Sequence, residues 1–415
     1  MNPRVTDRSS VKLLGVAIAA AMLPVVGVGT AGAQTSGQIY YNKADDDAPV
    51  VKTRIDDNTF IVSVWSEKMQ VEVPNIVHPP ANGEADSPVY YLVNGAGGGE
   101  DSASWQAQSD VVEFMSDKNV WTVTPLGGAF SYYTDWQKYD PNVQTRFARE
   151  TTKPLAFETY LAKELPDAFE AKFGGSTGEN RKRALSAISM TATSVLTIAQ
   201  NHPGRFQAIG SFSGCAETST PIGHQFINIV TGMRGGANLD NMWGPYPGEG
   251  WTDNDPVHNA DKFLQQMEDD ILPEMWITTG NGLPGPHESL TNDRLNDSSA
   301  ALANQAIVGG VIEAATQYCT ANLNRRFGQL GIPAHFDFKP YGTHSWGYWQ
   351  DDLHNSWPTF ARAMEVEGAE PAPEADVESG SLASVGSVDP AGSVDPAGSL
   401  ASVGSVDPAA SVASS

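Results

Sequence analysis

Short apolar runs alternate along this chain with longer amphipathic stretches, and this alternation limits the possible folds most strongly. Val89–Val93 is apolar throughout, as expected of a strand that is buried on both faces of a sheet. Residues 157–169 and 191–201 instead show helical patterns. Strands that alternate with helices form crossover units, so the sequence predicts an α/β fold with a central, mainly parallel sheet flanked by helices. Further strands are predicted over 120–126, 184–188, 208–212, 275–279 and 335–338, with an antiparallel hairpin over 60–73.

The two ends of the chain differ in composition from the middle. Residues 1–33 combine a basic leader, an apolar run and a small-residue cleavage pattern, which predicts a signal peptide. The apolar run is shorter than the ~20 residues that span a bilayer, so we expect an exported protein with no integral membrane segment after cleavage. Residues 365–415 repeat Gly-Ser-Val-Asp-Pro-Ala and contain no Lys, Arg or aromatic residue, which predicts a disordered acidic low-complexity tail. Residues 34–364 are then a single domain.

Charge and cysteine content exclude several classes of protein. The net charge is −24, from 25 Lys+Arg against 49 Asp+Glu. A nucleic-acid partner would need a basic face, so none is expected. Two cysteines are too few for a disulfide-dense scaffold or an all-cysteine zinc site.

Ser189 is a candidate nucleophile because of its place in the chain. The predicted strand 184–188 runs into Ser189 and then directly into a helix, the context in which a serine is held exposed on a tight turn. The usual motif is G-x-S-x-G, and here both glycines are missing. An ordinary helix N-cap serine is the alternative, and the local sequence does not choose between the two.

A nucleophilic serine needs a base and an acid. His344 follows the last predicted strand, where the order Ser, acid, His would place the base. Spacing does not choose the acid. The candidates between the serine and the histidine are Asp253, Asp255, Glu288, Asp293 and Glu313.

Two backbone amides are needed to stabilise the oxyanion of an acyl-transfer reaction. The amide of Met190, directly after the serine, is expected to be one of them. The glycine-rich loop 94–99, which follows the strand Val89–Val93, is expected to supply the other. This loop lacks the Gly-Lys-Ser/Thr that a phosphate-binding loop would carry.

A series of short segments matches one known family in order. Because of these segments, the chain resembles the antigen 85 family, the secreted mycolyltransferases of mycobacteria and corynebacteria. The resemblance covers most of residues 60–362 and is greatest to the corynebacterial members. The resemblance implies an α/β-hydrolase fold, a Ser-Glu-His triad and no metal or cofactor. The segments are YLVNG (91–95), YYTDW (132–136), FETYL (157–161), ELP (164–166), ISM (188–190), NMWGP (241–245), NDP (254–256), TGNG (279–282), THSW (343–346) and YW (348–349).

The resemblance also assigns roles to residues of this chain. Ser189 matches the nucleophile, His344 the base and Glu313 the acid, while Ala96 and Met190 match the oxyanion amides. The expected substrate-binding residues are Asn94, Ser345 and Trp346.

The implied reaction is transfer of a mycolyl group from trehalose monomycolate to a hydroxyl acceptor in the cell envelope. The mycobacterial enzymes have an aspartate and an arginine at the places of Asn94 and Gly97, so arabinogalactan or envelope-protein hydroxyls stand beside trehalose mycolates as acceptors. An exported carboxylesterase and a non-catalytic envelope or host-binding protein are the alternatives. We further expect a monomer, and a disulfide between Cys215 and Cys319 because export permits one.

Overall fold

The computed structural model describes residues 50–54, 59–84, 86–144, 151–175 and 182–366. The predicted signal peptide lies outside these residues. Of the predicted tail 365–415, the structure describes Glu365 and Val366, and Val366 is buried against the core that contains residues of α13; the rest lies outside. In the described part of the chain, no helix combines the length and the apolar character that crossing a membrane requires.

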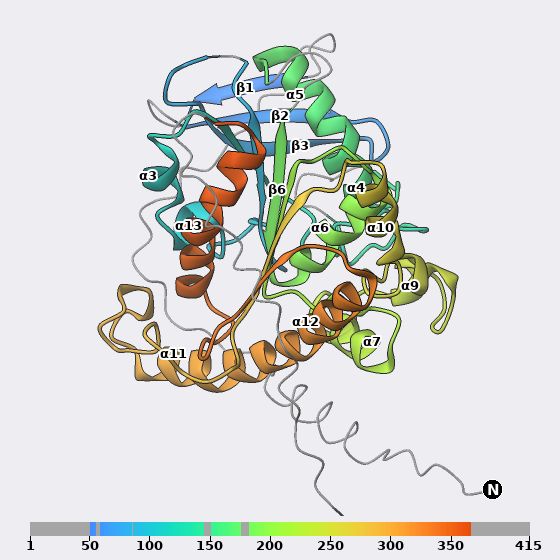
Figure 1. Ribbon diagram of the computed structural model, residues 1–415, viewed down its shortest axis with the longest axis vertical. Coiled ribbons are helices and arrows are strands. Elements are labelled where there is room, and N and C mark those ends of the chain that lie inside the picture. Colours follow the sequence, from blue (N-terminus) through green and yellow to red (C-terminus); the bar gives the residue numbers. More distant parts are fainter. Residues whose placement is uncertain (1–49, 55–58, 85, 145–150, 176–181, 367–415) are drawn as a thin grey trace, which may run out of the picture. The chain divides into compact units, whose positions relative to one another are not determined.

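In the described residues, nine strands form one mixed sheet in the order β1-β2-β3-β5-β4-β6-β7-β8-β9 (Figure 1). The six strands from β5 to β9 in this order run parallel to one another, and β3, β2 and β1 continue the sheet from β5 in antiparallel pairs. The predicted mainly parallel sheet is therefore confirmed. The strands are β1 Val50–Arg54, β2 Phe60–Ser66, β3 Val71–His78, β4 Val89–Val93, β5 Trp121–Pro125, β6 Arg183–Ile188, β7 Ala208–Phe212, β8 Glu274–Thr279 and β9 His335–Phe338.

The antiparallel edge extends the predicted hairpin. β2 and β3 pair from Phe60 opposite Val77 to Ser66 opposite Val71, so the second strand is longer than residues 60–73 indicated. Strand β1 pairs with β2 outside this hairpin and was not predicted, because Val50–Arg54 is short and mixes apolar with charged residues.

Helices cover both faces of the sheet, which explains the continuous apolar character of β4. Tyr91 and Val93 face the core formed with α5 Leu165–Phe173 and α6 Ser189–Asn201, whereas Tyr90 and Leu92 face the core formed with α13 Trp346–Ala363. Alternate side chains of a strand point to opposite faces, so each face buries its own set. In Figure 1, α3 and α13 lie on one side of the sheet, and α4, α5, α6 and α10 lie on the other.

The helix predicted over 157–169 is interrupted. It consists of α4 Phe157–Thr159, a π-helical turn η1 Tyr160–Glu164, and α5. Pro166 has no N–H to bond the carbonyl of Ala162, which instead accepts from Arg205 Nε. A π turn accommodates this change in the hydrogen-bond ladder. The remaining helices are α2 Trp105–Gln108, α3 Val111–Met115, α7 Pro221–Ile227, η2 Asn228–Arg234, α8 Leu239–Met242, α9 Glu249–Asp253, α10 Asp261–Glu268, η3 Asp293–Leu295, α11 Ser299–Asn304, η4 Gln305–Gly309 and α12 Gly310–Leu330.

The parallel strands bring their following segments to one edge of the sheet. Asn94, Ser189, Ser213 and Gly280 come directly after β4, β6, β7 and β8, and His344 lies in the segment between β9 and α13. Ligands of open α/β sheets bind at the carboxyl ends of the strands. The fold thus brings the predicted site residues Asn94, Ser189 and His344 to the same edge of the sheet as Ser213 and Gly280.

Candidate active site

Ser189 occupies a sharp turn between β6 and α6. Its φ is +57°, a left-handed conformation that is rare for a residue with a side chain, and it is the first residue of the helix. Ile188 holds the N-cap position, and the Ser189 hydroxyl faces away from the helix backbone toward His344. The N-cap interpretation is therefore wrong, and strain of this kind is typical of functional sites.

His344 joins the two other members of the predicted triad. Its Nε2 lies 2.7 Å from Ser189 Oγ, and its Nδ1 lies 2.7 Å from Glu313 Oε2. The backbone amide of His344 donates to the carbonyl of Gly309, and the edge of the Trp349 ring packs against the imidazole. The imidazole is thus fixed from both sides, with one nitrogen available to take a proton from the serine.

Glu313 lies on α12 and has 1% of its surface exposed. Oε1 accepts from Gly280 N at 2.7 Å, Ser213 Oγ at 2.8 Å and Thr279 Oγ1 at 3.2 Å. Burial alone would raise the pKa of this carboxyl, but the hydrogen bond and charge of His344, with the Gly280 and Ser213 donors, lower it below its ordinary value. The group is therefore held as a buried carboxylate.

Of the five acid candidates, Glu313 is the one that the structure brings to His344. Asp255 instead accepts from the backbone and hydroxyl of Ser219. Glu288 accepts from Thr343 Oγ1, next to the histidine, and from Tyr348 Oη on α13. Glu288 therefore anchors the segment that carries the histidine rather than the imidazole itself.

Ser213 contacts the acid of the predicted triad, and the sequence did not point to this residue. Its hydroxyl donates to Glu313 Oε1 and accepts from Trp349 Nε1 at 3.0 Å, so it connects the acid to α13. Like Ser189 it has a positive φ, +58°, and it is buried. The one signal in the sequence is its place directly after a strand of the parallel sheet.

The glycine-rich loop 94–99 lies against the serine. A Cβ on Gly95 would stand 3.3 Å from Ser189 Cβ, so only glycine leaves the present contact undisturbed. Thr191 Oγ1, in the first turn of α6, donates to the Asn94 carbonyl at 2.6 Å. The loop that carries Ala96 and the helix start that carries Met190 are thereby held together, although the direction of these two amides stays a prediction.

The three predicted substrate-binding residues differ in their surroundings. Asn94 is fully buried, and its Oδ1 accepts from Trp105 N. Ser345 is also buried and accepts from Thr343 Oγ1 at 3.3 Å. Trp346 is half-buried and packs edge-on against Trp105. Their contact with substrate stays a prediction.

An open cavity of about 470 Å³ begins at Ser189 and His344. Apolar side chains from α7, η2 and α12 supply much of its wall. The lining residues are Tyr132, Ser189, Met190, Thr193, Ser213, Cys215, Phe226, Ile229, Val230, Ile312, Ala315, Thr316 and His344.

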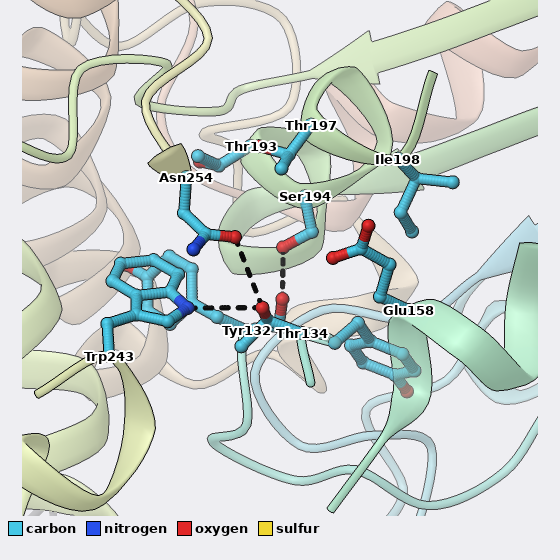
Figure 2. Close-up of a pocket in the computed structure, with 10 residues that line it drawn as sticks. Tyr132, Thr134, Glu158, Thr193, Ser194, Thr197, Ile198, Trp243 and Asn254 are labelled. Carbon is cyan, nitrogen blue, oxygen red and sulfur yellow. Dashed lines mark hydrogen bonds between the residues drawn. The ribbon is translucent and has the colours of Figure 1, made fainter. Parts of the chain in front are cut away.

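Tyr132 and Thr193 also line a smaller, more polar cavity of about 220 Å³, which Figure 2 shows. Ser194 donates to the carbonyl of Tyr132, and Thr134 accepts from Trp243 Nε1 and donates to Asn254 Oδ1. These bonds fix the Tyr132 wall of the larger cavity.

The predicted disulfide between Cys215 and Cys319 is confirmed. It joins the segment after β7 to α12, the helix that carries Glu313. The described residues contain no group of three or more His, Cys, Asp or Glu side chains arranged to hold a metal ion.

Comparison with known proteins decides the family. The family model described as "Putative esterase" matches residues 66–360, more than half of the chain. The chain belongs to this esterase family. Its members' α/β-hydrolase fold agrees with the sheet and with the strand–turn–helix placement of Ser189.

Relatives of this chain support the resemblance to antigen 85. The chain is 29% identical over 295 residues to the diacylglycerol acyltransferase/mycolyltransferase Ag85A of Mycobacterium tuberculosis, covering 71% of this chain and 79% of that one. It is 29% identical over 284 residues to Ag85B of Mycobacterium leprae, covering 68% and 78%. The crystal structure of Mycobacterium tuberculosis MPT51 (FbpC1) superposes with a TM-score of 0.56 at 23% identity, covering 73% of this chain and 97% of that chain. The predicted resemblance and fold are confirmed.

Proposed function

We propose that this esterase-family chain transfers a mycolyl group from trehalose monomycolate to a hydroxyl acceptor through an acyl-enzyme on Ser189. The observation that carries the proposal is the continuous hydrogen-bonded series from Ser189 through His344 to Glu313 at the mouth of an apolar cavity. A serine activated by a neighbouring base is the usual nucleophile of acyl transfer. The cavity supplies an apolar environment for an acyl chain next to that nucleophile.

The first half of the reaction forms the acyl-enzyme. His344 Nε2 takes the proton of Ser189 Oγ as the oxygen attacks the ester carbonyl carbon. The amides of Ala96 and Met190 stabilise the oxyanion, and the Glu313 carboxylate stabilises the imidazolium. His344 then returns the proton to the departing sugar oxygen as the ester bond breaks, which releases trehalose.

The second half transfers the acyl group. A hydroxyl of the acceptor loses its proton to His344 Nε2 and attacks the acyl carbon, and the proton then returns to Ser189 Oγ. Acceptors of this kind are trehalose monomycolate, arabinogalactan and hydroxyls of envelope proteins. These acceptors lie outside the cytoplasm, which is consistent with the predicted signal peptide.

An exported carboxylesterase, with water as acceptor, is the second candidate, and the esterase family match favours it. Incubation with trehalose monomycolate labelled in its acyl group, with and without added acceptor, distinguishes the two. Transfer of label to trehalose monomycolate or glycan supports the proposal, whereas release of free acid alone supports the esterase. If the label stays on the donor and Ser189→Ala is indistinguishable from the wild type, the result supports a non-catalytic binding protein.

A further inference from the structure

The Cys215–Cys319 disulfide lies on the wall of the cavity that begins at Ser189. Cys215 contributes directly to the lining, and Cys319 is fully buried behind it. The backbone of Cys215 is paired with Thr193, whose hydroxyl accepts from Cys215 N and donates to Cys215 O. Thr193 lies one turn of α6 beyond Ser189, so the disulfide stands away from the reacting oxygen and inside the cavity.

The spacing of residues along α12 gives the distance between the triad and the disulfide. Ile312, Ala315 and Thr316 line the cavity, and Cys319 follows three residues later on the same face of the helix. At 1.5 Å per residue, Ile312 and Cys319 are roughly 10 Å apart along the axis. Ile312 adjoins Glu313 at the triad end, so Cys319 lies about 10 Å from that end along α12.

The segment that carries Cys215 is fixed along the same helix. Ser213 donates to Glu313, and the carbonyl of Gly214 accepts from Thr320 Oγ1 at 3.3 Å. Beyond the disulfide, Asn322 Nδ2 donates to Glu217 at 2.7 Å. These contacts on both sides of the disulfide keep this wall from moving away to admit a longer chain.

The walls beside the path are fixed as well. Ile229 of η2 packs on Ala315 of α12, and both line the cavity. Tyr132 is held by the hydrogen bond from Ser194 to its carbonyl (Figure 2). The lining residues of α12 and η2 thus offer an acyl chain attached to Ser189 a covered direction along α12 toward the disulfide.

We propose that the Cys215–Cys319 disulfide forms the inner end of the acyl site and determines how much of an acyl chain the cavity accepts. The inference rests on the proposed function of Ser189. An extended chain advances roughly 1.2 Å per bond, from about 3.6 Å per three-bond residue, so roughly 10 Å holds about eight bonds. The cavity then takes an octanoyl chain, or one branch of that length, and further carbons stay outside it.

The test is the chain-length profile of p-nitrophenyl ester hydrolysis from acetyl to hexadecanoyl. In the wild type, kcat/KM rises about fourfold with each buried methylene up to octanoyl and then stops rising. In Cys215→Ala/Cys319→Ala the rise continues to longer chains, because both sulfurs are gone. The matched control Cys215→Val/Cys319→Ala, which removes the bond and restores most of the bulk at the position that lines the cavity, keeps the wild-type profile. An unchanged profile in the Ala pair, or the same shift in both pairs, overturns the proposal.

A second measurement needs no variant and holds even where the Ala pair does not fold. A crystal structure of the wild type with an octylphosphonyl group on Ser189 places the terminal methyl in contact with the disulfide. A chain that leaves the cavity in another direction overturns the proposal. Failure of the proposed function is read separately, in the assay with labelled trehalose monomycolate, where release of free acid alone or label that stays on the donor shows it whatever the chain-length profile.

Discussion

Replacement of Glu313 by glutamine tests the geometry of the triad, because the two groups are nearly equal in size but differ in their hydrogen atoms. In the wild type, Oε1 accepts from Gly280 N and Oε2 faces His344 Nδ1. A backbone N–H can only donate, so the amide oxygen of the variant must face Gly280. The amide nitrogen, also a donor, then faces Nδ1 of His344.

This orientation fixes the wrong tautomer of the histidine. When Nδ1 has to accept, the imidazole proton sits on Nε2, which can no longer take the proton of Ser189. The corresponding change of acid to amide in a Ser-His-Asp triad lowers kcat by on the order of 10⁴, or about 5 kcal/mol in activation free energy. We expect a loss of the same order here, since Glu313 makes the same contact with the histidine Nδ1.

The assay is steady-state hydrolysis of p-nitrophenyl octanoate by Glu313→Gln, with thermal unfolding recorded on the same sample. Glu274→Gln is the matched control, because Glu274 pairs with Arg362 at the start of β8, with 40% of its side chain exposed, and it should keep wild-type activity. A loss smaller than about tenfold in a folded Glu313→Gln would refute the tautomer argument.

Three further predictions concern stability. The pKa of Glu313 is lowered in the folded state, so the stability from its charge is present above its unfolded pKa of about 4.3 and is lost as pH falls through the folded value. Urea unfolding at a series of acidic pH values should therefore show a free energy of unfolding that falls with pH, and Glu313→Gln should reduce that dependence. Loss of the Cys215–Cys319 bond, which closes a separation of 104 residues, should lower the free energy of unfolding by about 2–5 kcal/mol in denaturant titrations, and an unchanged midpoint would contradict this. Glu170→Gln should cost about 3–5 kcal/mol in the same titration because it leaves the guanidinium of Arg183 buried without its charge partner, and a cost below about 1 kcal/mol would contradict it.

Eight of the nine described strands could be predicted because they are short and rich in apolar residues, whereas β1 could not. Val89–Val93 is buried on both faces, and its continuous apolar sequence reflects that directly. The positions of Ser189 and His344 followed from the same reasoning, since residues after parallel strands meet at one edge. Chain order therefore indicated the histidine and made the serine a candidate, while the local sequence left an N-cap serine as the alternative.

The acid could not be selected by spacing, because Glu313 reaches His344 only through the three-dimensional position of α12. The turn at Ser189 was ambiguous for a related reason. A positive φ is usually marked by glycine, and here the surrounding structure imposes it on a serine instead. Ser213 was missed since its contacts with Glu313 and Trp349 join residues 100 and 136 positions away.

The interruption of the helix over 157–169 shows a different limit. The amphipathic pattern gave the correct buried face, but the missing N–H of Pro166 changed the local hydrogen bonding. Arg205, distant in sequence, supplied the donor for Ala162 that made this break stable. Periodicity alone carries no information on such a partner.

The central claim is that Ser189 carries the acyl group. Its most direct test is the mass of the protein, and then of its peptides, after brief incubation with trehalose monomycolate and an acid quench. We predict an increase equal to one mycolyl group, located on the peptide that contains Ser189 and discharged when acceptor is added before the quench. The absence of any adduct while the donor is consumed, or an equal adduct in Ser189→Ala, would contradict the account.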